Sequence, residues 1–292
     1  MAFPTARSRN SYLAVLFIIL AVGIFLRIPS PLFSGPNAPF RGLAALHPAA
    51  GFNQIGFDEG LYRHYVNQLI AAGLTSYPDI VDRYIEVQKT LTGSILPPLR
   101  FLFIFSAYAW HQIFGTEALS ALHAVASVFS VLTLLLSTLF AWRLKGPAWA
   151  LAVAALMTFA PTQIHMSQHA LVDGFFTFWA LLCLWLLWEN LRAPRRPLFL
   201  AAYVLGLCLM VLTKENAFFV FVALMAIIVL NRWLQFGVVT RELLLCSIAG
   251  PLLGFVVLVF LAGGLDTLRT SYQLSVGKNY QLAYAIMTGD GP

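Results

Sequence analysis

Long apolar stretches alternate with short polar connectors along most of this 292-residue chain. Apolar runs approaching 20 residues are long enough, as helices, to cross the roughly 30 Å hydrocarbon core of a bilayer. The pattern predicts an all-α polytopic membrane protein with about seven transmembrane helices and no separate soluble domain. The predicted spans cover residues 11–28, 118–141, 148–164, 171–188, 198–213, 216–231 and 243–262.

The basic residues of the short connectors indicate how these spans are oriented. Loops on the cytoplasmic side of a membrane carry an excess of Arg and Lys. We therefore place the N-terminus and three connectors in the cytoplasm, on the basis of Arg7, Arg9, Arg143, Lys145, Arg192, Arg195, Arg196, Arg232 and Arg241. An even number of crossings must then separate the N-terminus from the first connector, and spans 11–28 and 118–141 already supply two.

A weaker apolar segment at 96–115 therefore cannot cross the membrane. It opens near two prolines and contains Arg100 and His111, which suits a helix lying along the outer interface. It belongs to a long first outer loop, residues 29–117. A second interfacial helix is expected at 57–72, where apolar residues recur every four positions, at Phe57, Leu61, Tyr65 and Leu69.

The whole chain, residues 1–292, is predicted to form one transmembrane module. The tail from 263 to 292 is expected on the same outer side as the first loop. It carries no closing span and no basic segment, which would suit the N-terminal part of a longer protein.

Composition supports the membrane class and argues against several others. The chain is 60% hydrophobic and 10% charged, whereas soluble domains carry about 25% charged residues. The net charge of +6 comes without a basic patch interleaved with aromatic residues, so we expect no nucleic-acid partner. The three cysteines lie in apolar runs without paired spacing, which argues against a disulfide framework. We expect a multi-pass protein of the plasma (inner) membrane.

Charge is scarce in this chain, and most of the unusual polar residues fall on the predicted outer side. Ionisable groups at membrane depth are costly and usually mark functional sites. Their gathering at one face is the strongest functional signal in the sequence. The candidate residues are Asp58, Glu59, Tyr62, His64, Arg100, His165, His169, Asp173, Lys214 and Glu215.

Ordinary structural roles are an alternative for several of these residues. Asp58 is placed to cap the helix that follows it, and Glu59 is spaced to pair with Arg63 at i+4. Lys214 could similarly pair with its neighbour Glu215 while its stem lies along apolar surface.

A divalent metal stays open as a further alternative. His165, His169 and Asp173 are spaced i, i+4 and i+8, and they would stack on one face of a continuous helix. Pro161 and the nearby predicted turn argue against that continuity. Asp173 would then have a simpler role, as the cap of a helix that begins at Gly174.

Four short motifs follow one another along the chain. They are "FDE" at 57–59, "LPPLRFL" at 96–102, "ALVD" at 170–173 and "TKE" at 213–215. In order, spacing and predicted side, they resemble the motifs of GT-C-type glycosyltransferases of the protein O-mannosyltransferase and aminoarabinose-transferase group. Two positions depart from that pattern, because Leu96 stands where the family has Lys and Glu215 stands where it has Gly.

The resemblance implies an enzyme that takes a sugar from a polyprenyl-phosphate carrier. The acceptor would be a hydroxyl of a lipid, protein or glycan on the non-cytoplasmic face. No cofactor is established by the resemblance, and a divalent metal stays open. A general base must activate that hydroxyl, and fixed cations must stabilise the departing phosphate. We expect Asp58 as the base in an inverting displacement, Glu59 and Asp173 in support, Arg100 and Lys214 at the phosphate, and substrate contacts from Tyr62, His64, His169 and Glu215.

A transporter or lipid flippase is the competing class, since it also gathers charges near a membrane cavity. Such proteins favour sites near the bilayer midplane, broken spans and repeated halves. Here the charges fall at one face and no internal repeat is visible. A non-catalytic scaffold is a third alternative, but such a protein would not need a general base and cations brought together at one face.

Overall fold

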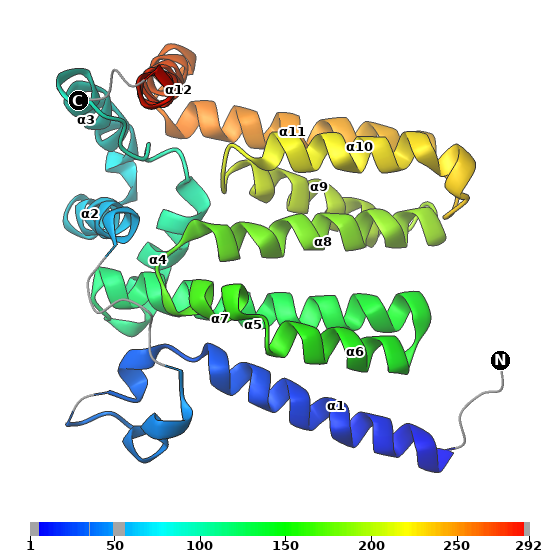
Figure 1. Ribbon diagram of the computed structural model, residues 1–292. Coiled ribbons are helices and arrows are strands. Elements are labelled where there is room, and N and C mark those ends of the chain that lie inside the picture. Colours follow the sequence, from blue (N-terminus) through cyan, green and yellow to red (C-terminus); the bar gives the residue numbers. More distant parts are fainter. Residues whose placement is uncertain (1–5, 35, 49–55, 289–292) are drawn as a thin grey trace.

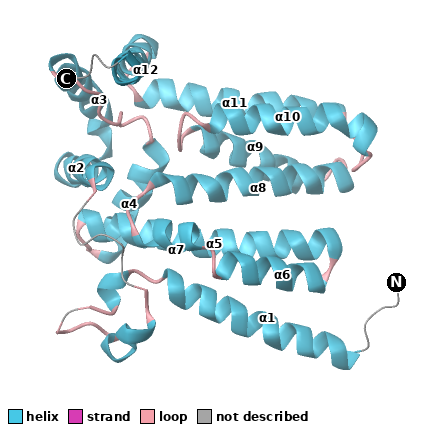
Figure 2. Cartoon of the chain, in the orientation of Figure 1, coloured by secondary structure: helices cyan, strands magenta, loops and turns pink. Residues whose placement is uncertain are grey.

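The computed structural model describes residues 6–34, 36–48 and 56–288, which form helices and no strand (Figures 1 and 2). This result confirms the predicted all-α class. One set of helices runs side by side as a bundle, and the other helices gather at one end of it, on the left in Figure 1. The candidate residues belong to that end.

The bundle helices coincide with the segments predicted as spans. They are α1 (Ala6–Arg27), α5 (Ala118–Lys145), α6 (Pro147–Thr158), α7 (Pro161–Gln168), α8 (Val172–Arg192), α9 (Pro197–Val211), α10 (Ala217–Leu234) and α11 (Arg241–Leu261). In length and apolar composition, α5, α8, α10 and α11 suffice to cross a membrane, and α6 with α7 would make a fifth span. Helix α9 and the described apolar part of α1 are shorter. The number of crossings, seven, stays a prediction.

The segment expected as one span at 148–164 is instead two helices, bent by 58°. Pro161 opens the second helix, and proline removes a backbone donor there. The bend frees carbonyl groups at the end of α6. Those of Met157 and Thr158 accept hydrogen bonds from the guanidinium of Arg27, a fully buried side chain at the end of α1. A buried cation from a distant helix therefore stabilises the bend.

The remaining helices form a layer across one end of the bundle (Figure 1). They are α2 (Phe57–Ala72), α3 (Tyr77–Thr90), α4 (Phe101–Phe114) and α12 (Leu265–Thr288), with 3-10 turns at Ser30–Leu32, Arg41–Leu46 and Leu74–Ser76. Helix α2 has the predicted bounds. Helix α4 is about 21 Å long, shorter than the roughly 30 Å of a bilayer core, and that 96–115 does not cross stays a prediction. Helices α3 and α12 were not predicted.

The main hydrophobic core lies beneath this layer. One face of α2 is buried, with Tyr62, Tyr65, Val66 and Leu69 at i, i+3, i+4 and i+7. These residues pack with side chains of α3, α4, α5 and α8 in a single cluster. The core therefore fixes how the first turn of α2 meets the ends of the long helices.

Close packing of α9 against α11 depends on two glycines four residues apart, Gly250 and Gly254. A Cβ added at Gly254 would lie 2.7 Å from the carbonyl oxygen of Cys208, and one at Gly250 would lie 2.7 Å from Cβ of Leu207. Small residues at this spacing allow helix backbones in membranes to approach closely.

We expect Gly254→Ala to lower the free energy of unfolding by about 1–3 kcal/mol, the usual cost of overpacking, because a backbone carbonyl cannot move aside. Gly277 is the matched control, since a Cβ there would meet nothing within 4 Å. Gly277→Ala should be neutral or stabilising by about 0.5–1 kcal/mol. Unfolding of both variants in detergent measures the difference, and equal effects would contradict the packing argument.

Candidate active site

The first turn of α2 directs its two acidic side chains differently. Gly56 is the N-cap residue, and Oε2 of Glu59 accepts its N–H group at 3.0 Å. The cap is therefore provided by Glu59, so the alternative that Asp58 caps this helix is wrong. Asp58 is left with its carboxylate half-buried at the surface of the layer.

Glu59 joins three parts of the chain. Its Oε1 atom accepts the N–H of Ala170 at 2.7 Å and lies 2.9 Å from Nε2 of His123. Nδ1 of His169 lies 3.4 Å from the same oxygen. The expected pairing with Arg63 is not formed, because Glu59 is directed into the protein, where it is 4% exposed, while Arg63 is exposed.

These contacts control the ionisation of Glu59. Burial opposes its charge, but hydrogen bonds from His123, Ala170 and Gly56 outweigh burial and lower its pKa to about 2. A carboxyl group whose pKa is depressed on folding stabilises the fold above its unfolded pKa. That stabilisation, about 3 kcal/mol here, is lost as the pH falls from about 4.5 through 2.

We therefore expect Glu59→Gln to have a lower free energy of unfolding than the wild type at neutral pH. The difference between the two free energies should become smaller below pH about 4.5. Unfolding free energies measured from pH 7 to pH 2 test this. Glu86→Gln is the control, because Glu86 is exposed and its ion pair is with the likewise exposed Lys89, so its variant should unfold with nearly the wild-type free energy at any pH. If the difference in unfolding free energy between Glu59→Gln and the wild type does not change with pH, the claim that Glu59 is ionised in the folded protein is contradicted.

Arg100 is held at the point where irregular chain leads into α4. The hydroxyl of Tyr65 donates to the carbonyl of Leu96 at 2.6 Å, and that of Tyr77 donates to the carbonyl of Pro98. The N–H of Leu102 donates to the carbonyl of Leu212 at 2.9 Å, which brings the start of α4 to the end of α9. These bonds place Arg100 beside the α9–α10 turn.

The guanidinium of Arg100 is already engaged. It donates to the Tyr62 hydroxyl at 2.6 Å and to the two carboxylate oxygens of Glu215 at 2.8 and 3.5 Å. Burial opposes its charge, but Tyr62 and Glu215 outweigh burial and raise the pKa of Arg100. In turn, burial of Glu215 is outweighed by Arg100, which lowers the pKa of that carboxyl group. The pair is therefore ionised, and Glu215 is the partner of Arg100 rather than of Lys214.

Lys214 pairs with Asp173 across the turns that lead into α10 and α8. Its Nζ atom lies 2.6 Å from Oδ1 of Asp173, whose side chain is 45% exposed. Helix α8 has Leu171 as its N-cap and begins at Val172, so Asp173 does not cap a helix starting at Gly174.

Asp58 joins neither of these pairs. No hydrogen bond or ion pair to its carboxylate is found within the described ranges. Its charge nevertheless acts on Tyr62: burial, together with the negative charges of Asp58 and Glu215, raises the pKa of that hydroxyl against the influence of Arg100. We define the charged cluster as Asp58, Tyr62, Arg100, Asp173, Lys214 and Glu215.

Two histidine predictions have different outcomes. His64 lies on the exposed face of α2, where its Nε2 is 2.9 Å from the amide nitrogen of Gln68, and it is not brought into the charged cluster. His169 lies with Glu59 instead, and its ring centroid is 4.4 Å from that of His165.

The predicted metal geometry is not formed. Helix α7 ends at Gln168 and α8 begins at Val172, so His165, His169 and Asp173 do not stack on one continuous helix. Within the described part of the chain, no group of three or more His, Cys, Asp or Glu side chains could hold a metal ion.

His123 and Arg27 received no role from sequence reasoning. His123 belongs to the apolar segment 118–141, and its depth in that segment was the available signal, because a polar residue inside a span needs a partner. Arg27 ends the first span and could equally have been an interfacial anchor.

Comparison with known proteins identifies the family. The family described as Dolichyl-phosphate-mannose-protein mannosyltransferase matches residues 75–264, which include four members of the charged cluster, Arg100, Asp173, Lys214 and Glu215. Asp58 and Tyr62 lie outside the matched range. A comparison with curated proteins found no match.

Among solved structures, the fold is similar to that of the Archaeoglobus fulgidus oligosaccharyltransferase in the apo form. The TM-score is 0.58 at 14% sequence identity, and the likeness covers 98% of this chain. The chain spans about a third of the length of that protein, since 35% of the latter is covered. The family match extends over well over half of the chain. The chain therefore belongs to the dolichyl-phosphate-mannose-protein mannosyltransferase family, a family of multi-pass membrane glycosyltransferases with a GT-C fold.

Proposed function

We propose that this chain transfers a sugar from a polyprenyl-phosphate carrier to an acceptor hydroxyl, with inversion at the anomeric carbon. The observation that carries the proposal is the position of Asp58. Its carboxylate is half-buried and has no partner within the described ranges, and its charge acts on Tyr62, whose hydroxyl accepts a hydrogen bond from Arg100. Family membership supports the same class of reaction.

Asp58 acts as the general base in this proposal. As the acceptor oxygen attacks the anomeric carbon, its proton passes to the Asp58 carboxylate. The bond between the anomeric carbon and the phosphate oxygen breaks, and the carrier phosphate leaves with the electron pair. A single in-line displacement of this kind inverts the configuration. A carboxylate already committed to a strong partner, as Glu59 is, would serve poorly as the base.

Lys214 is the better placed of the two cations to contact the departing phosphate. Positive groups fixed where charge develops lower the barrier, most strongly where water is scarce. The ammonium of Lys214 has three donors, and its partner Asp173 is half-exposed, so a phosphate can share the ammonium with that carboxylate. Arg100, by contrast, already donates hydrogen bonds to Tyr62 and Glu215. We infer that it holds the site together and adds a fixed positive charge.

Glu59 is a positioning residue in this scheme. It ties the first turn of α2 to α5 through His123 and to the α7–α8 junction through Ala170. Because Asp58 is the preceding residue of the same turn, these contacts orient the proposed base without touching a substrate. His169 lies against Glu59 and belongs to the same positioning set.

We place the charged cluster on the non-cytoplasmic face and the N-terminus in the cytoplasm. The cluster lies where α8 and α10 begin, whereas Arg143, Lys145, Arg192 and Arg232 lie in the last turns of α5, α8 and α10. An excess of basic residues at one end of a bundle favours the cytoplasm for that end. A plasma (inner) membrane location suits this arrangement.

The direct test is donor consumption by the purified protein in liposomes. The protein is given polyprenyl-phosphate mannose and a panel of protein, glycolipid and glycan hydroxyl acceptors. We expect free polyprenyl phosphate and a new glycoside of inverted configuration. A donor that crosses the bilayer unchanged would instead support the transporter alternative, and a donor left intact on its original side would overturn both.

A further inference from the structure

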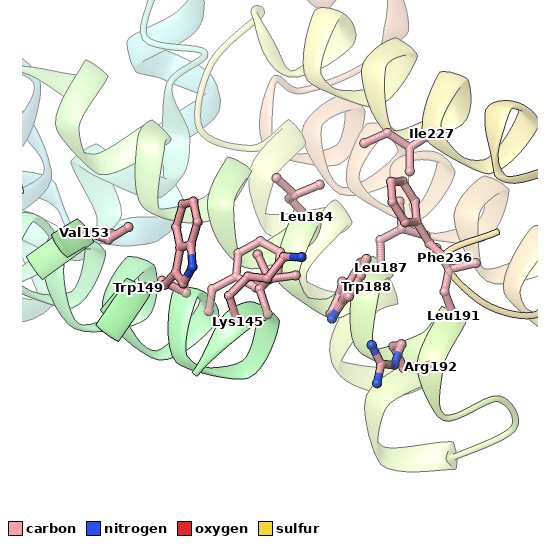
Figure 3. Close-up of a pocket in the computed structure, with 13 residues that line it drawn as sticks. Lys145, Trp149, Val153, Leu184, Leu187, Trp188, Leu191, Arg192, Ile227 and Phe236 are labelled. Carbon is pink, nitrogen blue, oxygen red and sulfur yellow. The ribbon is translucent and has the colours of Figure 1, made fainter. Parts of the chain in front are cut away.

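A cavity of about 730 Å³, whose lining Figure 3 shows, includes Lys145 and Arg192 from the last turns of α5 and α8, whereas the charged cluster includes Asp173 from the first turn of α8. The ends of α5 and α8 and the start of α6 form its walls, with Ile227 of α10 and Phe236 beyond it. The lining is mostly apolar and includes Phe140, Leu144, Trp149, Leu184 and Trp188. Its size is typical of ligand pockets, which range over about 300–1,000 Å³.

Two cations border this apolar cavity. Lys145 and Arg192 belong to its lining, and the guanidinium carbon of Arg192 lies 5.5 Å from the ring centroid of Trp188. Within the described part of the chain, neither forms an ion pair. The neighbouring acidic residue, Glu189, forms its ion pair with Arg143, and the Arg143 Nε atom lies 2.9 Å from the Glu189 carboxylate. The cavity thus combines an apolar wall with two cations that form no ion pair in the described part of the chain.

We propose that this cavity binds an acidic phospholipid of the surrounding membrane. The acyl chain would lie on the apolar wall, and the phosphate would lie between Lys145 and Arg192. Basic pockets between transmembrane helices suit anionic headgroups, and tryptophans such as Trp149 and Trp188 are common at headgroup depth. The charge complementarity favours an anionic lipid over a zwitterionic one.

This lipid site is separate from the proposed sugar-transfer chemistry. Asp173 lies in the first turn of α8 and Arg192 in its last turn. At 1.5 Å per residue the two are about 28 Å apart along the helix, close to the thickness of a bilayer core. A lipid in the cavity therefore lies in the opposite leaflet, and its binding can be tested without any assay of transfer.

The test measures lipid retention by native mass spectrometry of the detergent-purified protein. Phosphatidylglycerol and phosphatidylcholine with identical acyl chains are the probes. We expect preferential retention of phosphatidylglycerol, and binding about thirtyfold weaker in the double variant Lys145→Gln/Arg192→Gln. The matched control Arg196→Gln/Arg232→Gln removes the same charge from exposed residues outside the cavity and should bind as the wild type does.

A second variant tests the apolar wall while keeping both cations. Val153→Trp should fill the cavity and also abolish retention of phosphatidylglycerol. Soluble glycerol phosphate, offered as a competitor, should not displace the lipid if the acyl chain contributes to binding. Any of four outcomes would overturn the proposal. They are equal retention of the two lipids, unchanged binding in the Lys145/Arg192 variant, an equal loss of binding in the control variant, and unaffected binding in Val153→Trp.

Discussion

Asp58→Asn is expected to lower the rate of sugar transfer by about 10²–10⁴-fold, the usual contribution of a general base. Asparagine has nearly the same shape as aspartate but cannot accept the acceptor's proton. Asp58 makes no hydrogen bond or ion pair within the described ranges, so the substitution should leave the unfolding midpoint close to that of the wild type. The measurement is donor consumption at saturating donor, paired with unfolding in detergent.

Asp79→Asn is the matched control for Asp58→Asn. Asp79 also lies in the first turn of a helix in the same layer, α3, and it is exposed. Its variant should keep full activity. An active Asp58→Asn protein would refute the assignment of the base, and an inactive protein with a lowered midpoint would assign Asp58 a structural role instead.

Arg100→Met is expected to give a large loss of stability at the site. Breaking a fully buried ion pair costs about 3–5 kcal/mol, because one charge stays buried without its partner. The side chain of Arg100 is 7% exposed, whereas that of Glu215 is 45% exposed and keeps some water. We therefore expect about 2–3 kcal/mol, which includes the unpaired hydroxyl of Tyr62.

A double-mutant cycle separates the ion pair from other effects of Arg100→Met. Replacing both partners, as in Arg100→Met/Glu215→Met, should recover most of the lost stability, since no uncompensated charge stays behind. Additive losses would show that the pair is energetically unimportant. Donor consumption by the double variant then reports on chemistry alone, and full activity would exclude a role of Arg100 in transfer.

Much of the architecture was predictable because its signals are local. The apolar segments and the spacing of Phe57, Leu61, Tyr65 and Leu69 each lie within one stretch of chain, and the corresponding helices are found. Helix α3 carries the same kind of signal, with Tyr77, Ile80, Val81 and Tyr84 buried, and it could have been predicted too. Helix α12 has few buried residues, and its contacts with α3 depend on tertiary structure.

The pairings inside the site were not predictable by local rules. Such rules offered Arg63 as a partner for Glu59 and Glu215 as a partner for Lys214, whereas the partners found are His123 and Asp173. Each of these contacts joins residues more than 40 positions apart, and each depends on how α2 and the turns meet the bundle. All six members of the charged cluster were candidates from the sequence, but the structure was needed to show which residues form pairs.

The buried guanidinium of Arg27 has a consequence for the order in which the protein assembles. It binds carbonyl groups 130 and 131 residues later in the chain, at the bend between α6 and α7. The bend directs α7 toward the layer and so presents the N–H of Ala170 to Glu59. Helix α1 and the bend between α6 and α7 must therefore come together before the support of the proposed base is complete.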